Sequence, residues 1–318
     1  MAAGLSEIIT TTLRDRSGKL ADNVSKGNAL LTFTKRKGNW KPAEGRTIVQ
    51  ELDFAENGTF MFYTGSEILN ISDSEVLTAA EFDWKQASCA VKINGLEMDV
   101  QNVGRAQKID LLEGRITNAE RTMKNKITES MYSDGTGSSG KEIGGLELLV
   151  ADDPTTGTVG GINRATYTNW RNSLYDFSTE SVTASATTIQ SAMNTLWLRT
   201  SRGTDTPDLI LSDAVYFNYF WTSLQALQRL YDPDMAKLGF KSLAFNTAQV
   251  VYEDSAGMSA SHMYFLNTDF IHFRYAPKRL FKPLEKVMSI NQDAFVQLIT
   301  FAGNLTLSNA ARQGVMHA

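Results

Sequence analysis

The chain of 318 residues contains a single cysteine, Cys89, and only three histidines. One cysteine cannot form an intramolecular disulfide, and a Cys-rich zinc site needs several thiolates, so both are excluded. Histidine is the commonest metal ligand, and His262, His272 and His317 leave little material for a His-based metal cage. We therefore expect neither a metal ion nor a cofactor.

Long hydrophobic runs are also missing. No apolar run reaches the length of about 18 residues that a membrane-spanning helix requires, so no membrane partner is expected. The first residues lack the basic and apolar regions of a signal peptide. Apolar residues make up 42% and charged residues 21%, which is typical of a folded intracellular protein. The length suggests about two domains.

The chain has little net charge overall, but acidic and basic residues are concentrated in separate segments. The net charge is only −4, which argues against a protein that coats nucleic acid with its whole surface. Residues 1–46 carry +5, whereas residues 47–83 contain eight acidic residues and no Lys or Arg. Such blocks indicate either an interaction arm with a complementary surface or two solvated faces.

A turn signal stands inside the acidic block. Asn57-Gly58 separates the β-prone runs 47–54 and 59–64, and both residues tolerate the positive φ of a type I′ turn. An isolated hairpin is marginal in water, so this one is expected to lie on another surface. The candidate contact residues are Lys35, Arg36 and Lys37 in the basic block, and Glu51, Asp53, Glu56, Asn57 and Gly58 in the acidic one.

The rest of the chain mixes helical and strand patterns. Apolar residues at intervals of three and four predict one helix over about 97–132, roughly 54 Å long at 1.5 Å per residue. The first forty residues show no core pattern and are predicted to be extended. Further helices are predicted near 166–175, 187–199 and 213–230, and strands at 143–150, 207–211, 248–252, 262–266 and 270–274. A last hairpin is predicted over 295–307 with its turn at Gly303-Asn304. No regular βαβ alternation occurs, so the predicted class is α+β.

The glycine-rich loop at 135–141 matches two nucleotide-binding patterns and fails the context test of both. Gly135, Gly140 and Lys141 fit G-x-x-x-x-G-K, but Glu142 stands where a phosphate loop needs Ser or Thr. The loop also follows the long helix instead of preceding one, so no helix N-terminus faces an anion. We interpret it as a surface loop, and we find no catalytic constellation elsewhere. The chain is not expected to be an enzyme.

An arm, an acidic hairpin, a long helix and an α+β remainder, in that order, resemble the major capsid proteins of tailed bacteriophages, the Hong Kong 97-type capsid fold. The resemblance covers nearly the whole chain. The segments that carry it, in chain order, are Ser133-Asp-Gly-Thr-Gly137, Ile143-Gly-Gly-Leu146, Gly157-Thr-Val-Gly-Gly-Ile162, Trp170-Arg-Asn172, Pro207-Asp-Leu-Ile-Leu211, Leu238-Gly-Phe240, Phe245-Asn246, Tyr264-Phe-Leu-Asn267 and Phe301-Ala-Gly-Asn-Leu305.

The resemblance implies a domain division. Residues 1–44 would form an N-terminal arm and 45–83 an extended β-hairpin, the E-loop. Residues 84–155 would form a peripheral domain with the spine helix, 156–275 an axial domain, and 276–318 a return to the peripheral domain. Because the E-loop segment lacks lysine, we expect no covalent crosslink from it.

The resemblance also implies function and partners. The chain would assemble into hexamers and pentamers of an icosahedral shell around double-stranded DNA, in a virion built in the bacterial cytoplasm. Its implied partners are further copies of itself, a separate scaffolding protein, a portal protein at one vertex, and packaged DNA on the inner surface; a decoration protein is left open. The alternatives are an encapsulin-like nanocompartment shell and a nucleotide-binding enzyme that uses the loop 135–141.

Overall fold

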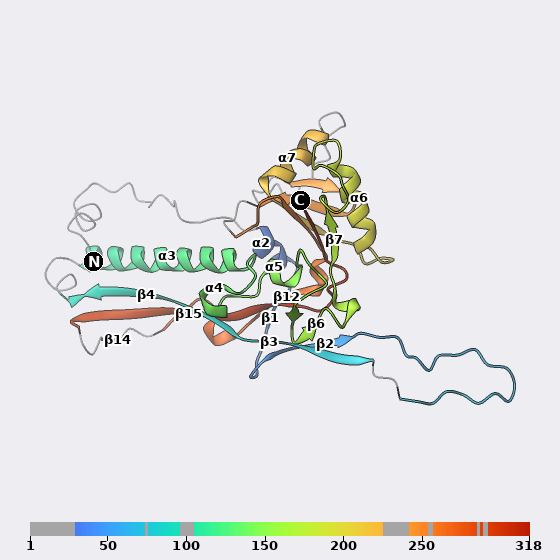
Figure 1. Ribbon diagram of the computed structural model, residues 1–318. Coiled ribbons are helices and arrows are strands. Elements are labelled where there is room, and N and C mark those ends of the chain that lie inside the picture. Colours follow the sequence, from blue (N-terminus) through green and yellow to red (C-terminus); the bar gives the residue numbers. More distant parts are fainter. Residues whose placement is uncertain are drawn as a thin grey trace.

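Two six-stranded sheets and one long helix dominate the computed structural model, which describes residues 29–73, 76–95, 105–224, 242–253, 257–284, 287–288 and 292–318 (Figure 1). The first sheet has the order β1-β12-β15-β13, with β4 and β14 also paired to β15. Its strands are β1 (Trp40–Pro42), β4 (Lys85–Asn94), β12 (Ile271–Tyr275), β13 (Lys282–Pro283), β14 (Val287–Met288) and β15 (Ala294–Leu307). The predicted α+β class is confirmed.

The long helix α3 (Arg105–Ser130) packs along β4 (Figure 1). Its residues Ala119, Met123 and Ile127 are buried, as the spacing of three and four predicts. β4 and β15 pair antiparallel over ten residues, from Lys85 opposite Gly303 to Asn94 opposite Ala294. The predicted beginning of the helix near residue 97 lies outside the described residues.

The hairpin predicted over 295–307 is wrong, because β15 is one continuous strand of 14 residues. Gly303 does not form a turn; it lies opposite Tyr275 of β12 and Lys85 of β4. A Cβ at Gly303 would lie 2.7 Å from the carbonyl oxygen of Arg274. The glycine therefore permits close strand packing, a role that sequence alone does not distinguish from a turn.

The second sheet has the order β7-β16-β11-β8-β10-β9 and is covered on one face by two helices (Figure 1). Its strands are β7 (Ser173–Asp176), β8 (Leu209–Ser212), β9 (Ser242–Phe245), β10 (Ala248–Tyr252), β11 (His262–Leu266) and β16 (Gly314–His317), and the helices are α6 (Ile189–Thr200) and α7 (Ala214–Ser223). Met263 and Phe265 pack with the helices, whereas Tyr264 and Leu266 face the opposite core. This alternation follows the two-residue period of a strand.

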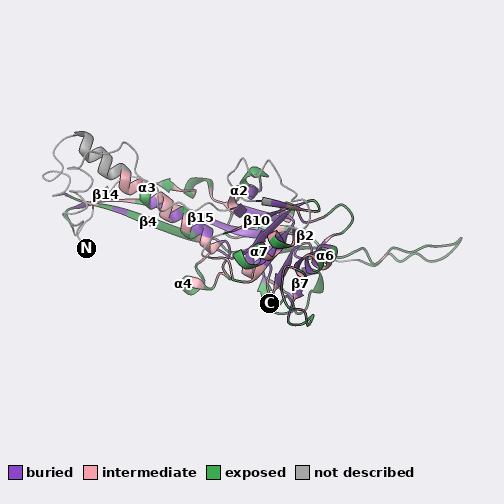
Figure 2. Ribbon diagram, turned by 90° about the horizontal axis from the view of Figure 1, so that it is seen from above, coloured by how far each residue is buried: buried purple, intermediate pink, exposed green. Residues whose placement is uncertain are grey.

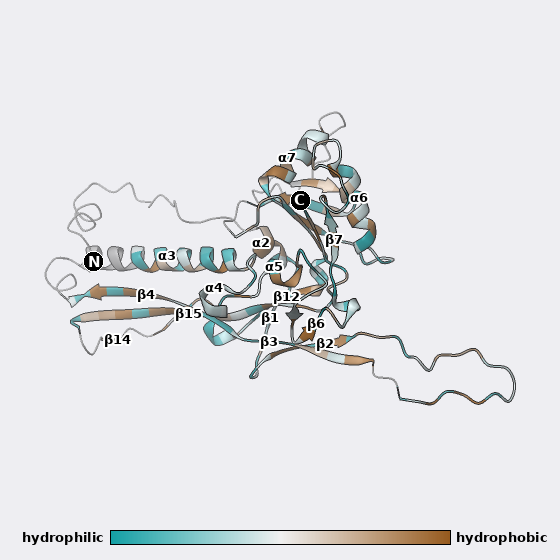
Figure 3. Cartoon of the chain, in the orientation of Figure 1, coloured by the Kyte–Doolittle hydropathy of each residue, from teal (hydrophilic) through white to brown (hydrophobic). Residues whose placement is uncertain are grey.

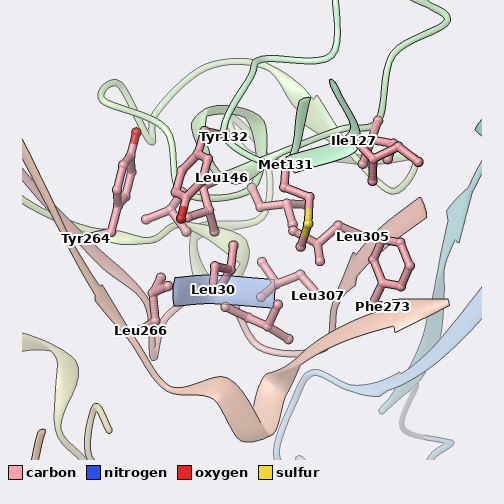
Figure 4. Close-up of a cluster of buried hydrophobic side chains, with 14 of the residues drawn as sticks. Leu30, Ile127, Met131, Tyr132, Leu146, Tyr264, Leu266, Phe273, Leu305 and Leu307 are labelled. Carbon is pink, nitrogen blue, oxygen red and sulfur yellow. The ribbon is translucent and has the colours of Figure 1, made fainter. Parts of the chain in front are cut away.

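Helix α2 (Ala29–Arg36) lies in that opposite core (Figure 4). Leu30 is fully buried and is grouped with Tyr132, Leu266 and Leu307. The amide of Ala29 donates to the buried carboxylate of Glu253 at 2.8 Å, and the hydroxyl of Tyr132 donates to the same oxygen at 2.9 Å. The expectation that the first forty residues are extended is therefore wrong for 29–36, since contacts distant in sequence stabilise this short helix.

Two further predictions are corrected by tertiary contacts. The predicted strand 143–150 contains the helical turn α5 (Leu146–Leu149), which follows Gly144-Gly145. The predicted helix 166–175 is a short 3-10 helix followed by β7, because Ser173–Asp176 pairs in parallel with β16. The remaining elements are α4 (Gly137–Gly140), β2 (Ile48–Asp53), β3 (Leu77–Phe82), β5 (Thr158–Val159) and β6 (Ile162–Asn163), with 3-10 turns at Thr168–Trp170, Thr268–Phe270 and Pro277–Arg279. Among the described residues, none of the helices has the length and apolarity to cross a membrane.

Candidate assembly interface

A two-stranded hairpin projects from the molecule (Figure 1). Its strands β2 and β3 pair antiparallel, with Ile48 opposite Phe82 and Asp53 opposite Leu77. Ile48, Leu52, Ala80 and Phe82 are buried, whereas the alternate residues of both strands are mostly exposed. The base of the hairpin therefore belongs to the core of this chain.

The hairpin base is held by the small β5–β6 hairpin and by the 3-10 turn at Thr168–Trp170. The amide of Glu81 donates to the carbonyl oxygen of Gly160 at 2.9 Å, and the side chain of Asn169 donates to the carbonyl oxygen of Phe54 at 2.9 Å. Gly160 has φ +58°, and a Cβ there would lie 2.8 Å from the Cβ of Ala80. Only glycine combines this φ with room for the side chains of Ala80 and Phe82, so packing against Gly160 orients the base of the hairpin.

Between the two strands the chain makes a long excursion, of which residues 54–73 and 76 are described. The type I′ turn predicted at Asn57-Gly58 is wrong, since β2 pairs with 77–82 instead of 59–64 and Gly58 does not adopt a positive φ. The Asn57 side chain instead accepts from the amide of Thr59 at 2.9 Å and from its hydroxyl at 2.7 Å, which is a local Asx turn. A turn with Gly65 at φ +59° lies midway along the excursion.

The excursion exposes large apolar side chains. Phe62, Ile68 and Ile71 are 89%, 93% and 91% exposed. The only ring near Phe62 among the described aromatic contacts is that of Phe60, edge to face with ring centroids 5.1 Å apart. Figure 2 shows the excursion outside the buried core, and Figure 3 shows hydrophobic stretches along it. Exposed apolar groups gathered on one projecting segment mark a surface that another molecule covers. The apolar run 59–64 is visible in the sequence, where its pattern predicts a strand paired within the chain; the structure shows it exposed and unpaired with β2.

The acidic candidates lie at the root of the excursion. Glu51, Asp53 and Glu56 are all exposed. Asp53, Glu56 and Asn57 line an open pocket of about 470 Å³ together with Arg202, which comes from the loop after α6. The acidic group and this arginine therefore border the same open pocket.

The basic candidates end helix α2. The Lys37 ammonium pairs with Asp208, and it also lies 3.2 Å from a carboxylate oxygen of Asp269. The Lys35 ammonium lies 5.9 Å from the centre of the Trp40 ring. Lys37 therefore has two carboxylate partners within its own chain, and all three basic residues are exposed.

The glycine-rich loop has no geometry for a phosphate. It follows the C-terminal end of α3, where backbone carbonyls carry partial negative charge. Ser138 and Ser139 adopt left-handed φ values of 52° and 62°, and the Lys85 ammonium donates to the carbonyl oxygen of Gly140 at 2.6 Å. Lys141 and Glu142 line an open groove of about 610 Å³ between α3 and β4.

No protein-family model and no curated protein sequence matches this chain. Solved structures do match it over nearly its whole length. In the capsid asymmetric unit of cyanophage A-1(L), the matching chain is 14% identical with a TM-score of 0.70, covering 99% of this chain and 98% of that chain. In the capsid of Myoviridae phage XM1, the matching chain is 12% identical with a TM-score of 0.58, covering 96% of this chain and 97% of that chain.

An encapsulin has the same overall fold. The holo-SrpI encapsulin complex from Synechococcus elongatus PCC 7942 matches at 8% identity and a TM-score of 0.55, covering 99% of this chain and 95% of that chain. The chain therefore has the capsid fold of tailed phages that the sequence resemblance predicted, with its extended hairpin, long helix beside β4 and β15, and helix-covered second sheet.

Proposed function

We propose that this chain is the major capsid protein of a tailed bacteriophage and forms the hexamers and pentamers of an icosahedral shell around double-stranded DNA. The observation that carries the proposal is the excursion between β2 and β3, which exposes Phe62, Ile68 and Ile71 to water beyond the anchored base of the hairpin. An isolated chain gains nothing from this arrangement, whereas a shell subunit buries such groups against its neighbours. The fold is the second support.

The proposed organisation keeps the arm, E-loop, peripheral domain and axial domain, with the second sheet as the axial domain and α3, β4 and β15 as the peripheral domain. Its bounds differ from the predicted ones at two places, because β12 belongs to the first sheet and β16 to the second. The proposed partners are further copies of the chain, a scaffolding protein during assembly, a portal protein and packaged DNA. The proposed location is the virion, after assembly in the bacterial cytoplasm. The role is structural and not enzymatic.

An encapsulin-like shell is the second candidate, because SrpI encapsulin has the same fold. Its TM-score of 0.55 lies below the 0.70 of the cyanophage capsid chain. Both functions require a closed shell of one chain, so assembly alone does not separate them. Packaging of DNA through a portal vertex distinguishes the phage capsid from a compartment that encloses a protein cargo.

Assembly is the first test. The purified full-length chain is expected to contain species of hexamer size or larger, and closed shells by negative-stain electron microscopy when scaffolding protein is co-expressed. The reason is that the exposed apolar excursion has no cover in the isolated chain. A stable 35.1 kDa monomer in light scattering, under all salt, concentration and scaffold conditions, contradicts the proposal.

The basic cluster gives a second prediction. We propose that Lys35 and Arg36 contact the acidic face of a neighbouring subunit that bears Glu51 and Asp53. A double variant, Lys35→Glu with Arg36→Glu, is expected to lower the yield of DNA-free procapsids, counted by electron microscopy. Exposed pairs contribute only about 0–1 kcal/mol each, but the contact recurs at every subunit of a shell.

Two controls sharpen this test. Adding Glu51→Lys and Asp53→Lys to the double variant is expected to restore procapsids, because the two charge signs are exchanged together. Lys37→Glu is expected to destabilise the unassembled chain instead, since it places a carboxylate beside Asp208. Normal procapsids with defective DNA packaging would instead assign Lys35 and Arg36 to phosphate binding on the inner surface.

A further inference from the structure

A histidine–carboxylate pair joins two parts of the chain that are distant in sequence. His262 begins β11, in the second sheet, and Asp152 lies between α5 and the β5–β6 hairpin. The Nε2 atom of His262 lies 2.9 Å from Oδ2 of Asp152, and its Nδ1 atom lies 2.7 Å from the carbonyl oxygen of Ala260. The His262 side chain is 14% exposed and that of Asp152 is 38% exposed.

The two partners of His262 decide its protonation. A backbone carbonyl can only accept a hydrogen bond, and an ionised carboxylate can only accept one as well. Both contacts are therefore hydrogen bonds only when both ring nitrogens carry hydrogen, which is the imidazolium form. Loss of one proton leaves one of the two contacts as a pair of acceptors, so the link to Asp152 or to Ala260 weakens.

We propose that Asp152 and His262 form a protonation-dependent latch, which holds the link between α5 and the β5–β6 hairpin onto the second sheet. That link leads to Gly160, which packs against the base of the projecting hairpin. The latch therefore connects the protonation of one imidazole to the segment that orients the hairpin. The inference does not depend on the proposed capsid function.

The groups around the pair agree with this assignment. His317 stacks on His262 with ring centres 5.5 Å apart and planes at 16°, and its Nε2 atom is buried without a partner among the described residues. Of the two stacked rings, His262 is the one with a carboxylate oxygen at hydrogen-bond distance. The other titratable groups that face these two rings are Glu147, Tyr264, Asp176 near His317, and Asp213, whose amide donates to the carbonyl oxygen of His262.

The sign of the pH dependence follows from the same contacts. Burial lowers the pKa of His262, but the hydrogen bonds to Asp152 and Ala260 outweigh it, and the pKa lies above its ordinary value of 6.5. Burial raises the pKa of Asp152, but the hydrogen bond to His262 outweighs it, and the pKa lies below 3.8. The latch is therefore complete below pH 6.5 and is lost as pH rises through the folded pKa of His262. At the acid end it is lost as pH falls through the folded pKa of Asp152.

Global unfolding is a poor measure of the latch, because His272 responds in the opposite direction. Burial, with Lys41 and Arg274 nearby, lowers the pKa of His272 to about 4, so its contribution to stability is lost as pH falls from 6.5 toward 4. Local hydrogen–deuterium exchange of the full-length chain separates the two, since His272 lies in the first sheet.

The experiment compares exchange of residues 148–157 at about pH 5.5 and about pH 9, corrected for intrinsic exchange rates. In the parent chain, protection is expected to fall about three- to tenfold at the higher pH. His262→Gln and Asp152→Asn are each expected to remove this difference. Asp153→Asn, a matched change of the adjacent exposed carboxylate, and His317→Gln are expected to retain it.

Each alternative result overturns the proposal. Equal protection at both pH values in the parent chain shows that the pair does not hold the segment. A pH step that persists in His262→Gln, or that disappears in Asp153→Asn, assigns the effect to another group. If the pH difference in protection disappears only in His317→Gln, the imidazole that controls it is that of His317 and not that of His262.

Discussion

Replacement of Phe62, Ile68 and Ile71 by serine is expected to abolish shell assembly and to leave the unassembled chain intact. The three side chains are about nine-tenths exposed, so the isolated chain loses almost no buried contact. Its free energy of unfolding is expected to change by less than about 0.5 kcal/mol. Burial of each such side chain against a neighbour contributes about 1.5–3 kcal/mol, so their combined loss weakens association by at least about a thousandfold.

The measurement combines urea unfolding of the dilute chain with electron microscopy of the concentrated one. A control variant, Thr64→Ser with Ser66→Ala, alters exposed polar positions of the same excursion and is expected to assemble normally. If the serine variant assembles as well as its parent, the excursion is not the interface. If instead the monomer unfolds more readily, the apolar groups belong to the chain's own core.

Gly145→Ala is expected to destabilise the chain by about 3 kcal/mol, a large effect for a single added methyl group. The amide of Gly145 donates to the carbonyl oxygen of Ser133 at 3.0 Å, and the amide of Leu146 donates to the carbonyl oxygen of Met131 at 2.8 Å. This segment therefore crosses the chain just after the end of α3. A Cβ at Gly145 would lie 2.5 Å from the carbonyl carbon and oxygen of Met131. These are backbone atoms, which cannot turn aside as a flexible side chain can.

A glycine-to-alanine substitution at Gly114 is expected to change stability in the opposite direction. Gly114 lies inside α3, and a Cβ there meets nothing within 4 Å. Gly114→Ala is expected to stabilise the chain by about 0.5–1 kcal/mol, because alanine loses less backbone entropy in a helix. Urea unfolding of both variants at one pH tests the pair, and equal shifts of the same sign would contradict the packing argument.

Local pattern determined much of the fold. The stripe at Ala119, Met123 and Ile127 defined the buried face of α3, since a helix of this length packs one side on a sheet. The strands predicted at 248–252 and 262–266 have the observed bounds, because compact β-prone runs between turn residues have few alternatives. The order of these elements was also sufficient for the resemblance to phage capsid proteins, which the solved structures confirm at the level of the fold.

Glycine and asparagine marked the places where sequence reasoning failed. Asn57-Gly58 and Gly303-Asn304 both have the composition of a hairpin turn. At the first, the Asn57 side chain forms an Asx turn and the strand partner comes from 77–82. At the second, Asn304 accepts from Gly144 at 3.2 Å and donates to Asp83 at 2.8 Å, inside a continuous strand. The residue types show only which backbone conformations are possible, whereas strand pairing determines whether a turn forms.

The candidate site was determined in part by the sequence and in part by tertiary structure. The acidic block, its lack of lysine and its apolar run at 59–64 were visible in the sequence. Only the tertiary structure decided that Lys37 pairs with Asp208, that Ile68 and Ile71 are exposed, and that Gly160 anchors the hairpin. The reason is physical: periodicity reports which residues share a face, but which face meets which depends on contacts between residues far apart in the chain.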